Sequence, residues 1–205
     1  MDEVKKGKFI VLYGINNLGK STQANMLARE LQAIGYKTEY LKYPIYELVP
    51  TGHKINEILR GGNLQNISEE KFQEIYAQNR RDYEPILKKK INEGIHIIAE
   101  DYTGTGIAWG VSKGADLNIL EKQNMGLMQE DIAILLDGER FLDGKEMNHL
   151  HESNDSLMQR CRETHKDLAK KYHWHIIDAN QPIALVHQNI LQIIKKTLLI
   201  GDKPT

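Results

Sequence analysis

A phosphate-binding pattern lies near the amino terminus, in the stretch YGINNLGKST at residues 13–22. Gly14, Gly19, Lys20 and Ser21 match G-x-x-x-x-G-K-[ST], a loop whose backbone N–H groups surround a phosphate. In such loops the lysine reaches the β- and γ-phosphate oxygens of a nucleoside triphosphate, and the hydroxyl is a ligand of Mg²⁺. The pattern therefore predicts ATP and Mg²⁺ as ligands, with Lys20 as a catalytic cation and Ser21 as a metal ligand.

Two adjacent carboxylates, Glu100 and Asp101, directly follow the apolar run IHIIA at residues 95–99. In open α/β sheets, ligands bind outside the carboxyl ends of the strands, so a strand that ends in carboxylates is a candidate site. A carboxylate in this place can accept the proton of a hydroxyl group or bind Mg²⁺ and its water. We expect both residues to be catalytic and Asp101 to be a metal ligand.

Apolar runs that could form such strands alternate with helical periodicities along the chain. Three runs are nearly continuous, as buried parallel strands are, and two others are further strand candidates. These are KFIVLYG (8–14), IHIIAED (95–101) and DIAILLDG (131–138), and then KTEYLKY (37–43) and HWHIIDA (173–179). The order predicts an α/β fold, a parallel sheet flanked by helices with right-handed crossovers. We expect one domain over residues 1–205, with a lid in the polar segment near 138–153.

The composition excludes several classes of partner. The 205 residues carry a net charge of -1 and a pI of about 6.7, which does not favour a nucleic-acid partner. The single cysteine, Cys161, rules out an internal disulfide and fits a reducing compartment. No apolar run approaches the roughly 20 residues of a membrane span, and the charged start MDEVKKGK does not resemble a signal peptide. We expect a cytoplasmic protein that binds small molecules, neither nucleic acid nor a membrane.

Six segments, in order along the chain, resemble motifs of the thymidylate kinase family. They are GINNLGKSTQ (14–23), KYP (42–44), IYAQNRRDY (75–83), DYTGTGIAW (101–109), GLMQEDIAILLD (126–137) and DANQPIALVHQNI (178–190). The guanine-binding N-K-x-D segment of a GTPase is absent. The resemblance implies a P-loop NTPase of the nucleoside monophosphate kinase type, with a five-stranded parallel sheet. It also implies phosphoryl transfer from ATP, with Mg²⁺, to a deoxynucleoside monophosphate, chiefly dTMP, and often a homodimer.

The resemblance also implies roles for individual residues. On the donor side it adds loop residues and an adenine-contacting loop: Asn16, Asn17, Thr22, Asp178, Asn180 and Gln181. On the acceptor side it adds Tyr43, Pro44, Tyr76, Arg80, Tyr102 and Gly106. Tyr76 would stack on the base, Arg80 would donate to it, and Tyr102 would lie beside the deoxyribose. The spacing agrees, because residues four apart share a helix face and base stacking contributes about 1–3 kcal/mol.

The chain departs from the family pattern where that pattern binds phosphate. Asn16 replaces an acidic residue, Asn17 replaces an arginine of one subgroup, and Tyr46 replaces an arginine after Phe-Pro. Most importantly, Asp101 stands where the D-R-Y motif has an arginine, which exchanges a cation for an anion. A carboxylate without a counter-charge would repel a phosphate dianion.

Three explanations of this exchange stay open. Other cations could hold the acceptor phosphate, for which the sequence offers His53, Lys54, Arg60 and Arg81. Alternatively the acceptor is a deoxynucleoside, with Glu100 or Asp101 accepting the proton of its 5′-hydroxyl and Gln78 binding the base. In the third, the chain is a degenerate protein that binds nucleotide without catalysis. The family's lid cation is also open: we expect Arg140, with Lys145, Arg160 and Arg162 as alternatives.

Overall fold

The structure, a computed structural model, describes residues 5–62, 66–139, 141 and 155–199. Five parallel strands form one sheet, as predicted, and the structure gives their order as β2-β3-β1-β4-β5. The strands are β1 (Phe9–Tyr13), β2 (Thr38–Lys42), β3 (His96–Glu100), β4 (Ile132–Asp137) and β5 (His175–Asp178). The helices are α1 (Lys20–Ala33), α2 (Thr51–Gly61), α3 (Glu69–Asn92), α4 (Thr103–Ser112), α5 (Leu117–Asn124), α6 (Asp155–Lys171) and α7 (Ile183–Leu199). None of these described helices is both long and apolar enough to cross a membrane.

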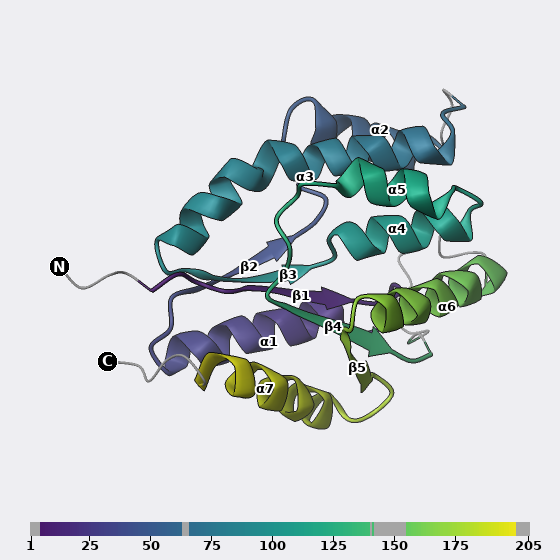
Figure 1. The fold of residues 1–205 in the computed structure, drawn as a ribbon. Helices are drawn as coiled ribbons and strands as arrows, with labels where there is room; N and C mark the ends of the chain where they lie inside the picture. Colours follow the sequence, from purple (N-terminus) through teal and green to yellow (C-terminus); the bar gives the residue numbers. More distant parts are fainter. Residues whose placement is uncertain (1–4, 63–65, 140, 142–154, 200–205) are drawn as a thin grey trace.

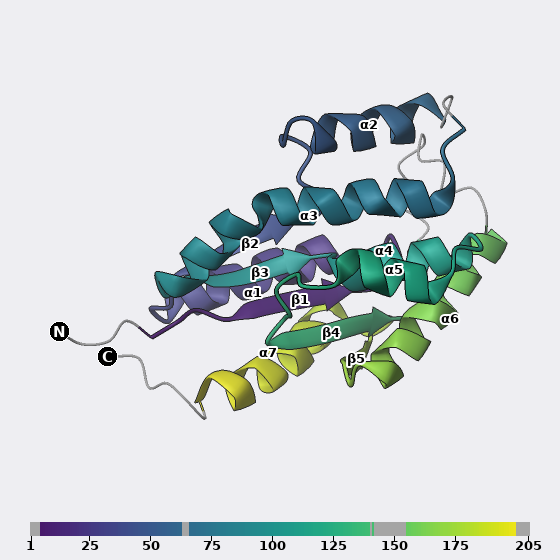
Figure 2. The same cartoon turned by 45° about the horizontal axis from the view of Figure 1, so that its top comes forward.

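Helices cover both faces of the sheet (Figures 1 and 2). Alternate residues of a strand point to opposite faces. Ile10 and Leu12 of β1 therefore pack toward α1 and α7, whereas Phe9 and Val11 pack toward α3 and the end of α6. Both sets are fully buried, which explains the nearly continuous apolar run of this strand.

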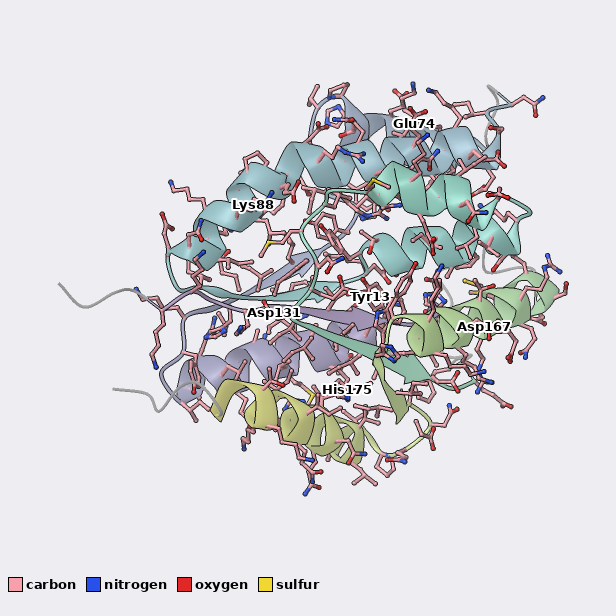
Figure 3. The ribbon with its side chains drawn as sticks, viewed as in Figure 1. Tyr13, Glu74, Lys88, Asp131, Asp167 and His175 are labelled. Carbon is pink, nitrogen blue, oxygen red and sulfur yellow. The ribbon has the colours of Figure 1, made fainter. Side chains whose placement is uncertain are left out.

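The ends of the elements follow local signals in the sequence. Ser68 caps α3, its hydroxyl accepting from the N–H of Lys71 at 3.3 Å. Gly35 follows α1 with a φ of 98°, a conformation that favours glycine. Tyr13, which Figure 3 labels at the carboxyl end of β1, stacks on Trp174 with a centroid distance of 4.1 Å. This stack ties the central strand to the residues that lead into β5.

Because all strands are parallel, their carboxyl ends meet at one edge. Lys42 and Glu100 are register partners at the ends of β2 and β3, and Tyr13 and Leu135 are partners in β1 and β4. The phosphate loop follows β1 at this edge and leads into α1. The topology therefore places the loop beside both predicted carboxylates.

Candidate active site

A cavity of about 1270 Å³ opens at the carboxyl edge of the sheet. Its walls come from the phosphate loop, the ends of β2 and β3, and helices α2, α3 and α4. Most of the predicted site residues line it. Those on the donor side are Asn16, Asn17, Gly19, Lys20, Ser21 and Thr22, those between are Glu100 and Asp101, and those on the acceptor side are Tyr43, Pro44, Tyr76, Arg80, Tyr102 and Gly106.

The phosphate loop has the geometry that its spacing predicts. Gly14 has a φ of 140°, and a Cβ there would lie 2.5 Å from the carbonyl oxygen of Leu136, so the loop requires glycine. The Lys20 ammonium donates to the carbonyl oxygens of Gly14 and Ile15, each at 2.9 Å. A Cβ added to Gly19 would meet no atom of the described residues within 4 Å, so the space beside this glycine is open. The loop thus surrounds a hollow at the start of α1, where a helix N-terminus favours an anion.

Glu100 is a buried carboxylate held by its neighbours on β2. Tyr40 donates its hydroxyl to Oε2 at 2.6 Å, and the Lys42 ammonium lies 3.2 Å from Oε1. Burial acts to raise the pKa of Glu100, but Lys20, the Ser21 and Tyr40 hydroxyls and Lys42 outweigh it and lower the pKa overall. Glu100 is therefore ionised at neutral pH, with both oxygens engaged.

Asp101 is bound differently from its neighbour. Its φ of 61° is left-handed, which is uncommon for a residue other than glycine. Thr105 donates to Oδ1 at 2.8 Å, and the Lys20 ammonium lies 3.7 Å from the same oxygen. Burial raises the pKa of Asp101, and the nearby Glu100 adds to this effect against the attraction of Lys20. Asp101 is thus the more weakly held carboxylate and the closer of the two to the loop lysine.

The acceptor side combines aromatic rings with a buried arginine. Arg80 is 4% exposed, and its guanidinium lies 6.0 Å from the ring centroid of Tyr102 and donates to Asn124 Oδ1 at 2.9 Å. Burial lowers the pKa of Arg80, and none of the described carboxylates lies within 4.0 Å of it. Tyr76 stands one turn away and stacks at a tilt against Phe72.

Several buried polar atoms on this side have no hydrogen-bond partner among the described residues. They are the hydroxyls of Tyr43 and Tyr102, Nε of Arg80 and Oε1 of Gln73. All four side chains line the cavity. Because buried polar groups are rarely left unpaired, this set indicates a polar ligand.

The segment between β2 and α2 is held against α3 by Asn79, which is fully buried. Its side chain accepts from the N–H of Ile45 at 2.8 Å and donates to the carbonyl of the same residue at 2.9 Å. This pairing holds the segment that carries Tyr43, Pro44 and Tyr46, which line the cavity.

The predicted adenine-contacting residues lie at the end of β5 and directly after it, and their contact with adenine stays a prediction. Asp178 accepts from the N–H of Asn180 at 2.9 Å and from Nε2 of Gln181 at 3.4 Å, at the exposed end of β5. Asn180 also pairs with the backbone of Glu139. These contacts join the ends of β4 and β5 beside the phosphate loop, and the three residues lie outside the lining of the cavity.

The predicted lid cation is Arg140, which lies outside the described residues, as do Lys145 and most of the segment 138–153. The two alternatives on α6 have other partners. Arg162 donates twice to Asp137, at 2.6 and 3.1 Å, and Arg160 donates to the carbonyl of Ser112 at 3.2 Å. Through these two hydrogen bonds, Arg162 supports the end of β4. Its guanidinium also lowers the pKa of Asp137 against the effect of burial.

Of the four cations offered for the acceptor phosphate, only Arg60 lines the cavity. His53 and Lys54 are exposed on α2, and Arg81 donates to backbone carbonyls of Gln123 and Met125. Sequence reasoning missed Lys42 and Lys113, which do line it. Lys42 could have been identified as a site residue, since it stands at the end of the strand beside Glu100.

Base recognition by Gln78, the amide considered for a nucleoside acceptor, is not supported. Gln78 is exposed and donates to Asp82 on the outside of α3. Gln73, five residues earlier, is buried and lines the cavity instead. The helical spacing could have identified Gln73 from the sequence, because Gln73 precedes Tyr76 by three residues and Arg80 by seven.

The family model described as thymidylate kinase matches residues 12–190 of this sequence. The chain belongs to the thymidylate kinase family. A relative from Invertebrate iridescent virus 6 is 29% identical over 204 residues, which are 97% of this chain and 92% of that protein. The human thymidylate kinase is 25% identical over 191 residues, 91% of this chain and 89% of its own.

Solved structures confirm the fold. The thymidylate kinase of Candida albicans superposes with a TM-score of 0.80 at 22% identity, covering 94% of this chain and 92% of that one. The chain is thus a thymidylate kinase family phosphotransferase with the P-loop kinase fold. Members of this family act on nucleotides with ATP and Mg²⁺.

Proposed function

We propose that this chain transfers the γ-phosphoryl group of ATP to the phosphate of dTMP, giving dTDP and ADP. One observation carries the proposal: a single cavity joins the phosphate loop, the carboxylates of β3 and a buried arginine among aromatic rings. Family membership supports it, as does the polar lining left without partners on the acceptor side.

The donor half fits a magnesium nucleotide. Mg²⁺ prefers oxygen ligands and is bound by one or two carboxylates together with phosphates and water. Ser21 and Asp101 supply such oxygens on the cavity wall, and no group of three His, Cys, Asp or Glu side chains among the described residues suggests a different metal. When bound, the ion would neutralise charge on the transferring phosphates. Lys20 would exchange the loop carbonyls for phosphate oxygens.

The acceptor half needs cations in place of the family arginine. We assign the acceptor phosphate to Lys42 together with Arg60, because both side chains line the cavity. Lys42 is about half exposed, so its ammonium can turn from Glu100 toward a ligand. Tyr46, at the position of a second family arginine, also lines the cavity.

The transfer itself requires little acid–base catalysis by the protein. Phosphoryl transfer depends mainly on holding the two phosphates in line and on stabilising the charge of the transferring group. Lys20 provides that charge on the donor side, and Lys42 provides it on the acceptor side. Glu100, ionised and held by β2, would hold Lys42 at the cavity before the acceptor binds, and Asp101 would hold the metal.

A second candidate, a deoxynucleoside kinase, has one observation in its favour. The pKa of Asp101 is raised by burial, as suits a general base, and the residue stands where the family has a phosphate-binding arginine. In that reaction Asp101 would accept the proton of a 5′-hydroxyl.

An ADP-release assay with a panel of acceptors decides between these functions. We expect turnover with dTMP and none with thymidine, and no turnover in Lys20→Met. Turnover with thymidine or deoxycytidine alone would support the nucleoside kinase instead. ATP binding without turnover of any acceptor would indicate a degenerate nucleotide-binding protein. The homodimer implied by the family resemblance stays a prediction, which light scattering on the purified protein would check.

A further inference from the structure

Gln73 is a buried amide that neither the phosphate chemistry nor the sequence motifs explain. It is 4% exposed on the first turns of α3 and lines the cavity. Its spacing from Tyr76 and Arg80 puts the three side chains on one face of the helix. The amide therefore belongs to the wall where the base of the acceptor is expected.

The orientation of this amide is fixed by its neighbours. Nε2 of Gln73 donates to Oε1 of Glu69 at 2.7 Å, and the Lys113 ammonium donates to Oε2 of Glu69 at 3.1 Å. A carboxylate paired with an ammonium has only acceptors to offer, so the amide must turn its nitrogen toward Glu69. Oε1 of Gln73 then points away from Glu69, and it is buried without a hydrogen-bond partner among the described residues.

Arg80 brings a donor to the same place. A Cβ at Gly106 would lie 2.6 Å from Nη2 of Arg80 and 2.9 Å from Oε1 of Gln73, so both groups converge on this glycine. A side chain at position 106 would collide with both groups. The wall thus presents an acceptor next to a donor, both fixed from behind: Gln73 by Glu69, and Arg80 by Asn124.

We infer that Gln73 is a specificity-determining residue that selects acceptors whose base carries an N–H beside a carbonyl. Thymine offers N3–H next to O4, which match Oε1 of Gln73 and the guanidinium of Arg80. Cytosine has a bare nitrogen at N3 and an amino group at C4, so both contacts would be reversed in the same pose. A site built to hydrogen-bond one pattern rejects the other strongly, because its buried groups stay unpaired. This inference rests on the proposed function and deepens it by assigning base discrimination to one amide.

The test is a pair of substitutions on α3, Gln73→Met and Gln78→Met. Methionine keeps the length and helix propensity of glutamine and removes the amide. Binding of dTMP and of dCMP is measured by calorimetry, alongside turnover. In Gln73→Met we expect the affinity for dTMP to fall about 10- to 100-fold and that for dCMP to change little, so that the preference for dTMP collapses. Gln78→Met, the same change at an exposed site, should leave both unchanged.

A second variant tests the orientation of the amide. In Glu69→Gln the new side chain can donate as well as accept, so Gln73 can turn its nitrogen toward the cavity. We expect dCMP to bind better than in wild type and dTMP worse. A residue that only supports the helix would weaken both ligands together and could not improve either.

Two results would overturn the inference: a parallel loss of dTMP and dCMP binding in Gln73→Met, or a wild-type protein with no preference between them. Calorimetry separates this from the proposed function. Selective binding of dTMP without turnover would refute the kinase activity and leave the role of Gln73 standing.

Discussion

Replacing Lys42 with methionine tests the assignment of the acceptor phosphate. Lys42 ends β2, its ammonium lies 3.2 Å from Oε1 of Glu100, and its side chain is 52% exposed. The substitution keeps most of the aliphatic length and removes only the charge. Glu100 keeps its hydrogen bond from Tyr40 at 2.6 Å, so the carboxylate is not left without a partner.

Two magnitudes follow from this geometry. A hydrogen bond to a charged group contributes about 1.5–3 kcal/mol, so the affinity for dTMP should fall roughly 10- to 150-fold. An ion pair with a half-exposed lysine contributes about 1 kcal/mol or less to folding, so the melting temperature should fall by no more than about 4 °C. The loss is therefore expected in acceptor binding and not in the fold.

The assay compares a phosphorylated acceptor with an unphosphorylated one. Calorimetry with dTMP and with thymidine should show a loss for dTMP only, because thymidine lacks the phosphate. Lys42→Arg should restore most of the affinity, since it keeps the charge, and Lys54→Met, on the exposed side of α2, should behave like wild type. Equal losses for dTMP and thymidine would refute the assignment, as would unchanged dTMP binding.

Three further substitutions give distinct outcomes. Asp101→Asn should lower kcat by about 100-fold or more, and wild-type activity would disprove the role of Asp101 at the metal. The same substitution should raise the free energy of unfolding at pH 7, because the raised folded-state pKa of Asp101 means that its ionised carboxylate disfavours the fold. Tyr40→Phe removes the hydrogen-bond donor to Glu100, so the lowered pKa of Glu100 should rise. The pH below which activity and stability are lost should therefore move upward, as measured by pH–rate profiles and by urea titrations at several pH values. An unchanged acid limit would count against this reasoning. Arg162→Met should lower the melting temperature by about 2–8 °C through loss of its two hydrogen bonds to Asp137. The decrease should be larger than in Arg160→Met, and an unchanged melting temperature in scanning calorimetry would contradict the prediction.

The donor half could be predicted from the sequence because its geometry is local. The spacing from Gly14 to Ser21 determines a loop between one strand and one helix, and both elements lie where the apolar patterns indicate. Strands β1, β3 and β4 are likewise predicted from their continuous apolar runs, since a buried strand needs no partner to be recognised.

The acceptor half could be predicted only in part because its geometry depends on pairing between distant segments. The contact of Lys42 with Glu100 requires the register of β2 against β3, which no local pattern gives. The buried amide of Gln73 is set apart from the exposed Gln78 only by which face of α3 meets the cavity.

Several costly features of this protein lie on one cavity, which argues that the acceptor site is functional. Asp101 is held at a left-handed φ of 61°, and such strain costs about 1–3 kcal/mol. Arg80 is a buried cation without a described carboxylate within 4.0 Å, and Gln73 leaves an acceptor unpaired beside it. A protein that bound ATP alone would need neither the buried Arg80 nor the unpaired acceptor of Gln73, because both lie on the acceptor side of the cavity. Each cost is recovered only when a ligand with a phosphate at one end and a hydrogen-bonding base at the other fills the acceptor side.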